Sequence, residues 1–254
     1  MKRSILGRGN NKRRPAGLFM LKAVIFDMDG VLVDSHPSHT TAWRKLLLLH
    51  GKQMMQSHVE LVRSGRKKEE LLQWFLGDLT SDQIRVCSQE KDAFFQEQMG
   101  NLTAIPGVQK LLPELSRAAV PMAVASCGGR VRVYRILELL RINQYFRFVM
   151  TGDDVAQGKP DPEIYLKAAE QLGVRPAESL VFEDSVSGIL AAAAAGMKSV
   201  GIADKHRAQS LVQAGAVDTL PDFTGVSFEQ VRQLFSSKSN KQRHGIYSHS
   251  AVVG

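Results

Sequence analysis

The sequence predicts an α/β fold with two parts, a doubly wound parallel sheet and an inserted α-helical cap. Two observations support this prediction. Short, continuous apolar runs alternate with helical patterns, and strands of that kind are buried on both faces of a parallel sheet. In addition, about 65 residues without a convincing strand separate the first two runs, which is too long for a loop in a compact domain.

Five apolar runs are the predicted strands, and helical patterns separate most of them. The strands are "KAVIFD" (22–27), "VPMAVAS" (120–126), "FRFVMTGDD" (146–154), "SLVFED" (179–184) and "KSVGIAD" (198–204). The helices are expected at about 107–118, 129–141, 162–172 and 185–195. Asp161, Pro162 and Gly173 indicate the N-cap, the first residue and the end of the third helix. This alternation is typical of a Rossmann-like core.

The inserted segment predicts a separate helical domain. Its helical patterns cover residues 39–51, 67–77 and 81–100. The predicted division is a core of residues 20–35 and 103–235, a cap of residues 36–102, and two disordered tails of residues 1–19 and 236–254. Hinges are expected near 34–36 and 102–106, where the chain passes between core and cap. Opening and closing about these hinges would admit a ligand to the core.

The basic charge of the chain is confined to its two tails. The net charge is +8, but residues 1–19 carry six Lys or Arg and residues 236–254 carry three, with no acidic residue in either tail. The remainder has 24 basic and 25 acidic residues, which gives a net charge of −1. A nearly neutral body does not predict a specific nucleic-acid partner. Met20 is an alternative start of the protein.

The composition excludes several other classes of protein. Hydrophobic residues make up 44% and charged residues 23%, which is ordinary for a globular protein, and no apolar run approaches the roughly 20 residues of a membrane span. Lys22 interrupts the first apolar run and no cleavage site follows it, which argues against a secretory signal. Cys87 and Cys127 lie far apart, as suits a reducing compartment. We therefore expect a cytoplasmic protein with no membrane partner, and a monomer.

Polar residues follow the predicted strands where each of them ends. Asp27 ends the first strand, Ser126 the second, and Glu183 and Asp184 the fourth, while Lys159 lies in the loop "GKPDP" after the third. The carboxyl ends of parallel strands meet at one edge of a sheet, so these side chains should converge. Carboxylates that converge repel one another unless a hard cation such as Mg²⁺ joins them. A lysine and a hydroxyl nearby would hold the oxygens of a phosphate group.

The residue types predict roles in phosphoryl transfer. Asp27 is ionised at neutral pH and can attack phosphorus directly, with Mg²⁺ offsetting the repulsion between the two anions. Asp29 can protonate the leaving oxygen and then activate water. Gly30 allows a tight turn beside the phosphate. Ser126 and Lys159 would stabilise the transferring group.

Four motifs carry a resemblance to a known family. "DMDGVLVDS", "VASCGG", "GKPDP" and "VFEDSVSGI" resemble, in order, the four motifs of the haloacid dehalogenase superfamily, in the branch of sugar-phosphate phosphatases and β-phosphoglucomutase. The resemblance covers residues 21 to about 230. It implies that Asp27 is the nucleophile and Asp29 the acid/base. It also implies a magnesium site made by Asp27, the Asp29 backbone carbonyl and Asp184, with Glu183 nearby. Ser126 and Lys159 would bind the phosphate. The acid at position 29 argues against the dehalogenases, which lack it.

The cap should select the substrate. His39 and Trp43 match a pattern of β-phosphoglucomutase, in which the histidine helps to position the acid/base; the alternatives are a surface position for His39 and a core position for Trp43. Lys67, in "RSGRKKEELL", aligns with a basic residue that binds a second phosphate, or it is simply solvated. After Ser126 the resemblance leads us to expect small hydroxylated residues, whereas the chain has Cys127, Gly128 and Gly129.

The sequence therefore predicts a magnesium-dependent phosphatase of a small phosphorylated metabolite, a sugar phosphate. A β-phosphoglucomutase is the second interpretation, and a catalytically silent binding protein is the third. Two competing motifs fail. "CGGRVR" places Arg132 five positions after the cysteine, where a cysteine phosphatase needs six, and "GDDVAQGKP" has the wrong spacing for a nucleotide-binding loop.

Overall fold

Six strands form one parallel sheet in the order β3–β2–β1–β4–β5–β6. The computed structural model describes residues 20–237, so the predicted tail 1–19 lies outside the described residues, as does the tail 236–254 except for Ser236 and Ser237. The strands are β1 (Ala23–Phe26), β2 (Met122–Ala125), β3 (Phe148–Met150), β4 (Ser179–Glu183), β5 (Lys198–Ile202) and β6 (Asp218–Leu220). The predicted fold class is confirmed, but the third strand is shorter than expected and the sixth was not predicted.

Helices cover both faces of this sheet. The core helices are α5 (Val108–Arg117), α6 (Arg130–Leu139), α7 (Glu163–Leu172), α8 (Val186–Ala194), α9 (Lys205–Ala214) and α10 (Phe228–Ser236). Helix α7 begins at Glu163, one residue later than predicted, and the backbone nitrogen of Glu163 donates to Asp161 at 2.9 Å. It ends as predicted at Gly173, which has a φ of +70°.

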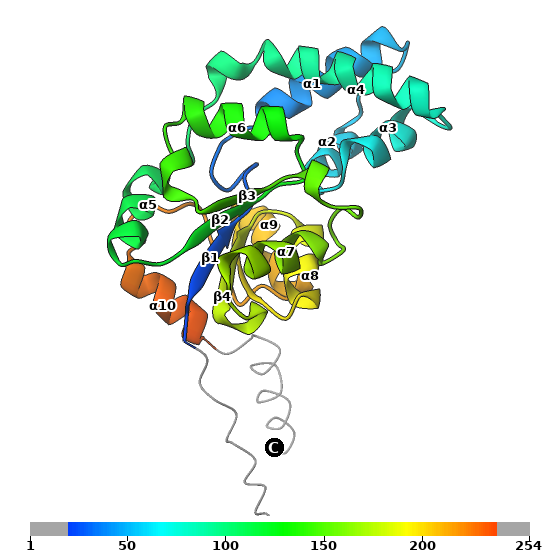
Figure 1. The fold of residues 1–254 in the computed structure, drawn as a ribbon. Helices are drawn as coiled ribbons and strands as arrows, with labels where there is room; N and C mark the ends of the chain where they lie inside the picture. The colour runs from blue at the N-terminus through cyan, green and yellow to red at the C-terminus, as the bar shows by residue number, and fades with distance from the viewer. Residues whose placement is uncertain (1–19, 238–254) are drawn as a thin grey trace, which may run out of the picture.

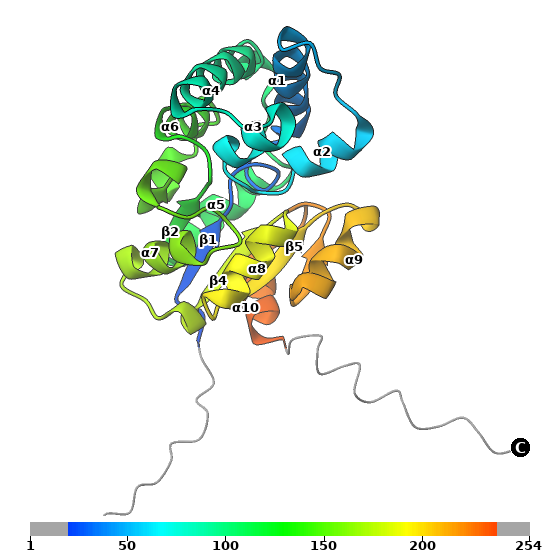
Figure 2. The same ribbon diagram turned by 90° about the vertical axis from the view of Figure 1, so that its right-hand side faces the viewer.

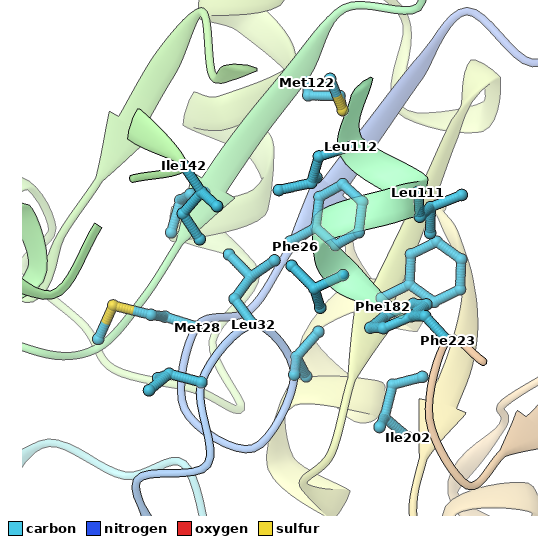
Figure 3. Close-up of a cluster of buried hydrophobic side chains, with 14 of the residues drawn as sticks. Phe26, Met28, Leu32, Leu111, Leu112, Met122, Ile142, Phe182, Ile202 and Phe223 are labelled. Carbon is cyan, nitrogen blue, oxygen red and sulfur yellow. The ribbon is translucent and has the colours of Figure 1, made fainter. Parts of the chain in front are cut away.

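The two faces of β1 belong to two apolar clusters. Val24 and Phe26 pack with residues of α5, α6 and α10, and Phe26 stacks on Phe182 of β4 at 5.3 Å between ring centroids (Figure 3). Ala23 and Ile25 face the opposite side and pack with residues of α7 and α8. Burial on both faces explains why these strands have continuous apolar sequences.

Four further helices lie beyond the carboxyl ends of the strands (Figures 1 and 2). They are α1 (His36–Leu49), α2 (Gln56–Val62), α3 (Lys68–Leu76) and α4 (Ser81–Gln96), of which α2 was not predicted. They have an apolar cluster of their own, in which Trp43 meets Phe75 edge-on at 5.1 Å between ring centroids. Across the described residues, no helix has the length and apolar character needed to cross a membrane.

Candidate active site

The sheet reverses its order of strands between β1 and β4, and the site lies at that point. Strands β2 and β3 continue to one side of this pair, and β5 and β6 continue to the other. Phe26 pairs with Phe182, so Asp27 and Glu183 are neighbours at the carboxyl ends of β1 and β4. Ligands of open α/β sheets bind at such a reversal point. The predicted convergence of Asp27 with the acidic pair at the end of β4 is therefore present.

Lys159 lies at the centre of this group and is only 1% exposed. Its ammonium donates to Asp27 Oδ1 at 2.6 Å, to Glu183 Oε1 at 2.7 Å and to the backbone oxygen of Ala125 at 3.1 Å. Burial alone would lower the pKa of Lys159, but the charges of Asp27 and Glu183 outweigh burial and raise its pKa well above the usual value. Lys159 is thus a permanent cation beside Asp27.

Asp27 retains electrostatic repulsion that a cation would relieve. Burial raises its pKa, Lys159 opposes this effect, and the negative charges of Glu183, Asp184 and Asp29 raise the pKa further. Asp27, Asp29 and Asp184 line one cavity of about 90 Å³. Two carboxylates and a backbone carbonyl fit Mg²⁺, which prefers oxygen ligands and retains water. Such a set needs no third side-chain ligand. A group of three side chains that could bind a metal occurs, among the residues described, only at His50, Cys87 and Glu90 in the cap, away from this set.

Asp184 is held by residues that the sequence did not reveal. His36 Nε2 lies 2.6 Å from Asp184 Oδ2, and Arg207 donates to the Asp184 backbone oxygen at 2.8 Å. Gly30 adopts a φ of +77°, and a Cβ there would lie 2.3 Å from His36 Nε2 and 2.5 Å from Asp184 Oδ2. The predicted tight turn at Gly30 is therefore required by both its backbone conformation and this close approach.

Both carboxylate oxygens of Asp29 accept hydrogen bonds. Arg132 donates to Oδ1 at 2.9 Å and to Oδ2 at 2.8 Å, and Ser35 donates to Oδ1 at 2.6 Å. Burial would raise the pKa of Asp29, but Arg132 and His39 together hold it well below the usual value. The predicted acid/base is therefore anionic in this arrangement, which is the form that can accept a proton from water.

His39 lies against Asp29 rather than on the helix surface. Its Nε2 is 3.3 Å from Asp29 Oδ1, and Lys91 of α4 donates to its Nδ1 at 2.9 Å. Burial and the positive charge of Lys91 lower the pKa of His39 to about 3, so the ring is neutral and carries its proton on Nε2, toward Asp29. Trp43 is 2% exposed in the apolar cluster of the cap and also borders the cavity.

The two remaining predicted residues make other contacts. Ser126 is buried, and its hydroxyl accepts a hydrogen bond from the backbone nitrogen of Gly128 at 3.1 Å. Lys67 donates to the backbone oxygens of Val155 at 2.8 Å and Ala156 at 3.2 Å, and so connects the cap to the core. It borders a second cavity, of about 230 Å³, rather than the first. Their roles in binding phosphate stay predictions.

A family model for the haloacid dehalogenase-like hydrolases matches residues 21–196, a range that contains each of the predicted site residues. The chain belongs to this family. It is 32% identical over 215 residues to the validoxylamine A 7'-phosphate phosphatase of Streptomyces hygroscopicus subsp. limoneus, covering 84% of this chain and 99% of that one. It is 33% identical over 205 residues to a phosphorylated carbohydrates phosphatase of Thermotoga maritima, covering 78% and 93% of the two chains.

A solved structure agrees with this assignment. The β-phosphoglucomutase of Clostridium difficile superposes on the hydrolase with a TM-score of 0.77 at 25% identity, over 85% of this chain and 97% of that one. The predicted family and the predicted class of enzyme, a hydrolase, are therefore confirmed.

Lys91 gives this hydrolase a testable dependence of stability on pH. Lys91 is 3% exposed, and burial together with Arg132 lowers its pKa from 10.5 to about 7. Between these values the unfolded chain binds a proton that the folded chain lacks, so stability rises with pH. Relative to Lys91→Met, the free energy of unfolding of the wild type should rise by about 1.4 kcal/mol per pH unit between about pH 7.5 and 9.

Denaturant unfolding at several pH values measures this difference. Lys45→Met is the control, because Lys45 lies on α1, which packs against α4, and pairs with Glu97, but its side chain is 42% exposed. A difference between the wild type and Lys91→Met that stays constant with pH would contradict the expectation.

Proposed function

We propose that the protein is a Mg²⁺-dependent phosphatase that hydrolyses a small phosphorylated metabolite, a sugar phosphate, through an aspartyl-phosphate on Asp27. The observation that carries this proposal is the convergence of Asp27, Lys159 and Asp184 at the reversal point of the sheet, with Asp29 beside them at one cavity. Each of these groups has a distinct role in moving a phosphoryl group.

In the first step, a carboxylate oxygen of Asp27 attacks phosphorus as the bond between phosphorus and the ester oxygen breaks. Asp29, which must first take up a proton from solvent because it is anionic in the arrangement described above, gives that proton to the departing oxygen, so the product leaves as an alcohol. In the second step, water attacks phosphorus, Asp29 takes a proton from that water, and the bond between Asp27 and phosphorus breaks to release phosphate. Lys159 stabilises charge on the transferring group throughout.

Mg²⁺ would be held by the carboxylates of Asp27 and Asp184 and by the backbone oxygen of Asp29. When bound, it supplies positive charge between the anionic nucleophile and the phosphate. Glu183 stays outside this set, because Lys159, Tyr165 and Ser185 already donate to its two oxygens at 2.6 to 3.2 Å.

Because the proposed reaction depends on Mg²⁺, chelation with EDTA should abolish turnover, and added Mg²⁺ should restore it.

The relatives support a carbohydrate phosphate as the substrate, since the two phosphatases named above act on validoxylamine A 7'-phosphate and on phosphorylated carbohydrates. A phosphomutase is the second candidate. The contact of His39 with Asp29 favours it, because the same pattern resembles β-phosphoglucomutase, as does the fold.

One assay separates the two candidates. Purified protein is incubated with Mg²⁺, β-glucose 1-phosphate and a trace of the 1,6-bisphosphate, and both glucose 6-phosphate and free phosphate are measured. We expect free phosphate to exceed glucose 6-phosphate. A large excess of glucose 6-phosphate would establish the mutase instead, and the absence of both products would move the substrate away from glucose phosphates.

The remaining expectations stay predictions. They are a cytoplasmic monomer without a specific nucleic-acid partner, and a cap that opens and closes on the core. Closure would be stabilised by Lys67 with the backbone oxygen of Val155, and by the Ser187 hydroxyl with the backbone oxygen of Ser64. Substrate entry would require these two contacts to break.

A further inference from the structure

Arg132 is the charged partner of Asp29 and has no part in the chemistry described above. It belongs to the first turn of α6, 103 residues from Asp29 along the chain. Its guanidinium makes two parallel hydrogen bonds to the carboxylate, at 2.9 and 2.8 Å. A bidentate pair of this kind fixes the orientation of a carboxylate as well as its position.

The loop before α6 leaves room for this arrangement. A Cβ at Gly128 would lie 2.0 Å from Nη2 of Arg132 and 2.7 Å from its Cζ. A real Cβ does not come this close to another atom, so any other residue at position 128 would require the guanidinium to shift. The adjacent Gly129 differs, since the nearest atom to a Cβ there is Asp153 Oδ2 at 3.9 Å.

The cap also contacts Arg132. The Cζ atom of Arg132 lies 5.3 Å from the centre of the Phe95 ring in α4, and the Arg132 side chain is mostly buried. His39, also from the cap, lies 3.2 Å from Nη1. The guanidinium is therefore held by the core loop at Gly128 and by the cap at Phe95, with its hydrogen bonds directed at Asp29.

We propose that Arg132 is a positioning residue that orients the carboxylate of Asp29, and that Gly128 leaves the space in which the Arg132 guanidinium lies. The proposal rests on the proposed function in giving Asp29 the role of acid/base. It explains the glycine at position 128, where a small hydroxylated residue was expected. Among the described residues, Arg132 is the one side chain that donates to Asp29 Oδ2, so without it the carboxylate could rotate out of line with the attacking water.

Para-nitrophenyl phosphate is a suitable probe, because its leaving group departs without a proton at neutral pH. Attack by Asp27 forms the phosphoenzyme and releases nitrophenolate with the electron pair of the broken bond. Hydrolysis of the phosphoenzyme still needs Asp29 to accept a proton from water. We expect Arg132→Met to show a full burst of nitrophenolate, followed by a steady-state kcat about 10- to 100-fold below that of the wild type. A merely structural defect would reduce the burst itself.

Three matched variants complete the test. Gly128→Ala should reproduce the loss with Arg132 still present, Gly129→Ala should behave as wild type, and Arg132→Lys should fail to rescue because an ammonium cannot form the bidentate pair. Gly128→Ala combined with Arg132→Met should be no slower than either variant alone. Additive losses, or equal effects of the two glycine variants, would overturn the proposal.

The pairing can also be measured without turnover. If the wild type releases no nitrophenolate and hydrolyses no ester of a broad phosphate panel, the proposed function fails, and unfolding of Asp29→Asn, Arg132→Met and the double variant still decides the contact. We expect the shifts in denaturation midpoint to be clearly non-additive. Additive shifts would show that Arg132 does not hold Asp29.

Discussion

Replacing Asp27 with asparagine is expected to lower kcat at least about ten-thousandfold, because an amide cannot replace the carboxylate as nucleophile and no phosphoenzyme can form. The fold should survive this change. Lys159 keeps its contact with Glu183 at 2.7 Å, so the buried ammonium is not left without a counter-charge. Steady-state hydrolysis in the presence of Mg²⁺ measures the loss, and acid quenching with a radiolabelled phosphate ester tests for the covalent intermediate.

Asp34→Asn is the matched control for this experiment. Asp34 belongs to the same motif as Asp27 but is exposed, so the same chemical change there should leave kcat unchanged. Label that remains on the protein in Asp27→Asn would contradict the assignment of the nucleophile. If the wild type and Asp27→Asn were equally inert over a broad panel of phosphate esters, the interpretation as a catalytically silent binding protein would be favoured.

The carboxylates at the centre of the site were predictable because they follow buried strands. Asp27, Glu183 and Asp184 come directly after apolar runs, and parallel strands bring their carboxyl ends to one edge whatever the details of packing. Lys159 was predicted from its loop and its motif. Its role in neutralising Asp27 and Glu183 emerged only from the contacts of its ammonium at 2.6 and 2.7 Å.

The surroundings of Asp29 were not predictable in the same way. Arg132 and Lys91 lie in helices, where a basic residue is usually solvated, and their burial depends on how the cap meets the core. No local pattern encodes a contact across 103 residues, so Arg132 entered the sequence analysis only as part of a failed cysteine-phosphatase motif. Strand β6 was missed for a local reason, since the edge strand Asp218–Leu220 has three residues and no apolar run.

Replacing Lys159 with methionine is expected to lower the free energy of unfolding by about 3 to 5 kcal/mol, which is the usual result of removing one partner from a buried ion pair. Lys159 is buried, and the change leaves Asp27 and Glu183 as neighbouring carboxylates without a cation between them. The loss should be larger at neutral than at acidic pH, because protonation of Asp27, whose pKa is raised by burial, removes one of the two repelling charges. Denaturant unfolding without Mg²⁺ measures it, and Lys67→Met is the control, since among the described residues Lys67 donates only to backbone oxygens.

Combining Lys159→Met with Glu183→Gln separates the structural effect of Lys159 from its catalytic effect. The glutamine removes one of the two stranded charges, so the double variant should be more stable than the sum of the two single changes predicts. If stability returns while turnover stays low, Lys159 acts on the transferring phosphate as well as on its neighbours. If Lys159→Met were as stable as the wild type, the buried charges could not be coupled as their distances of 2.6 and 2.7 Å indicate.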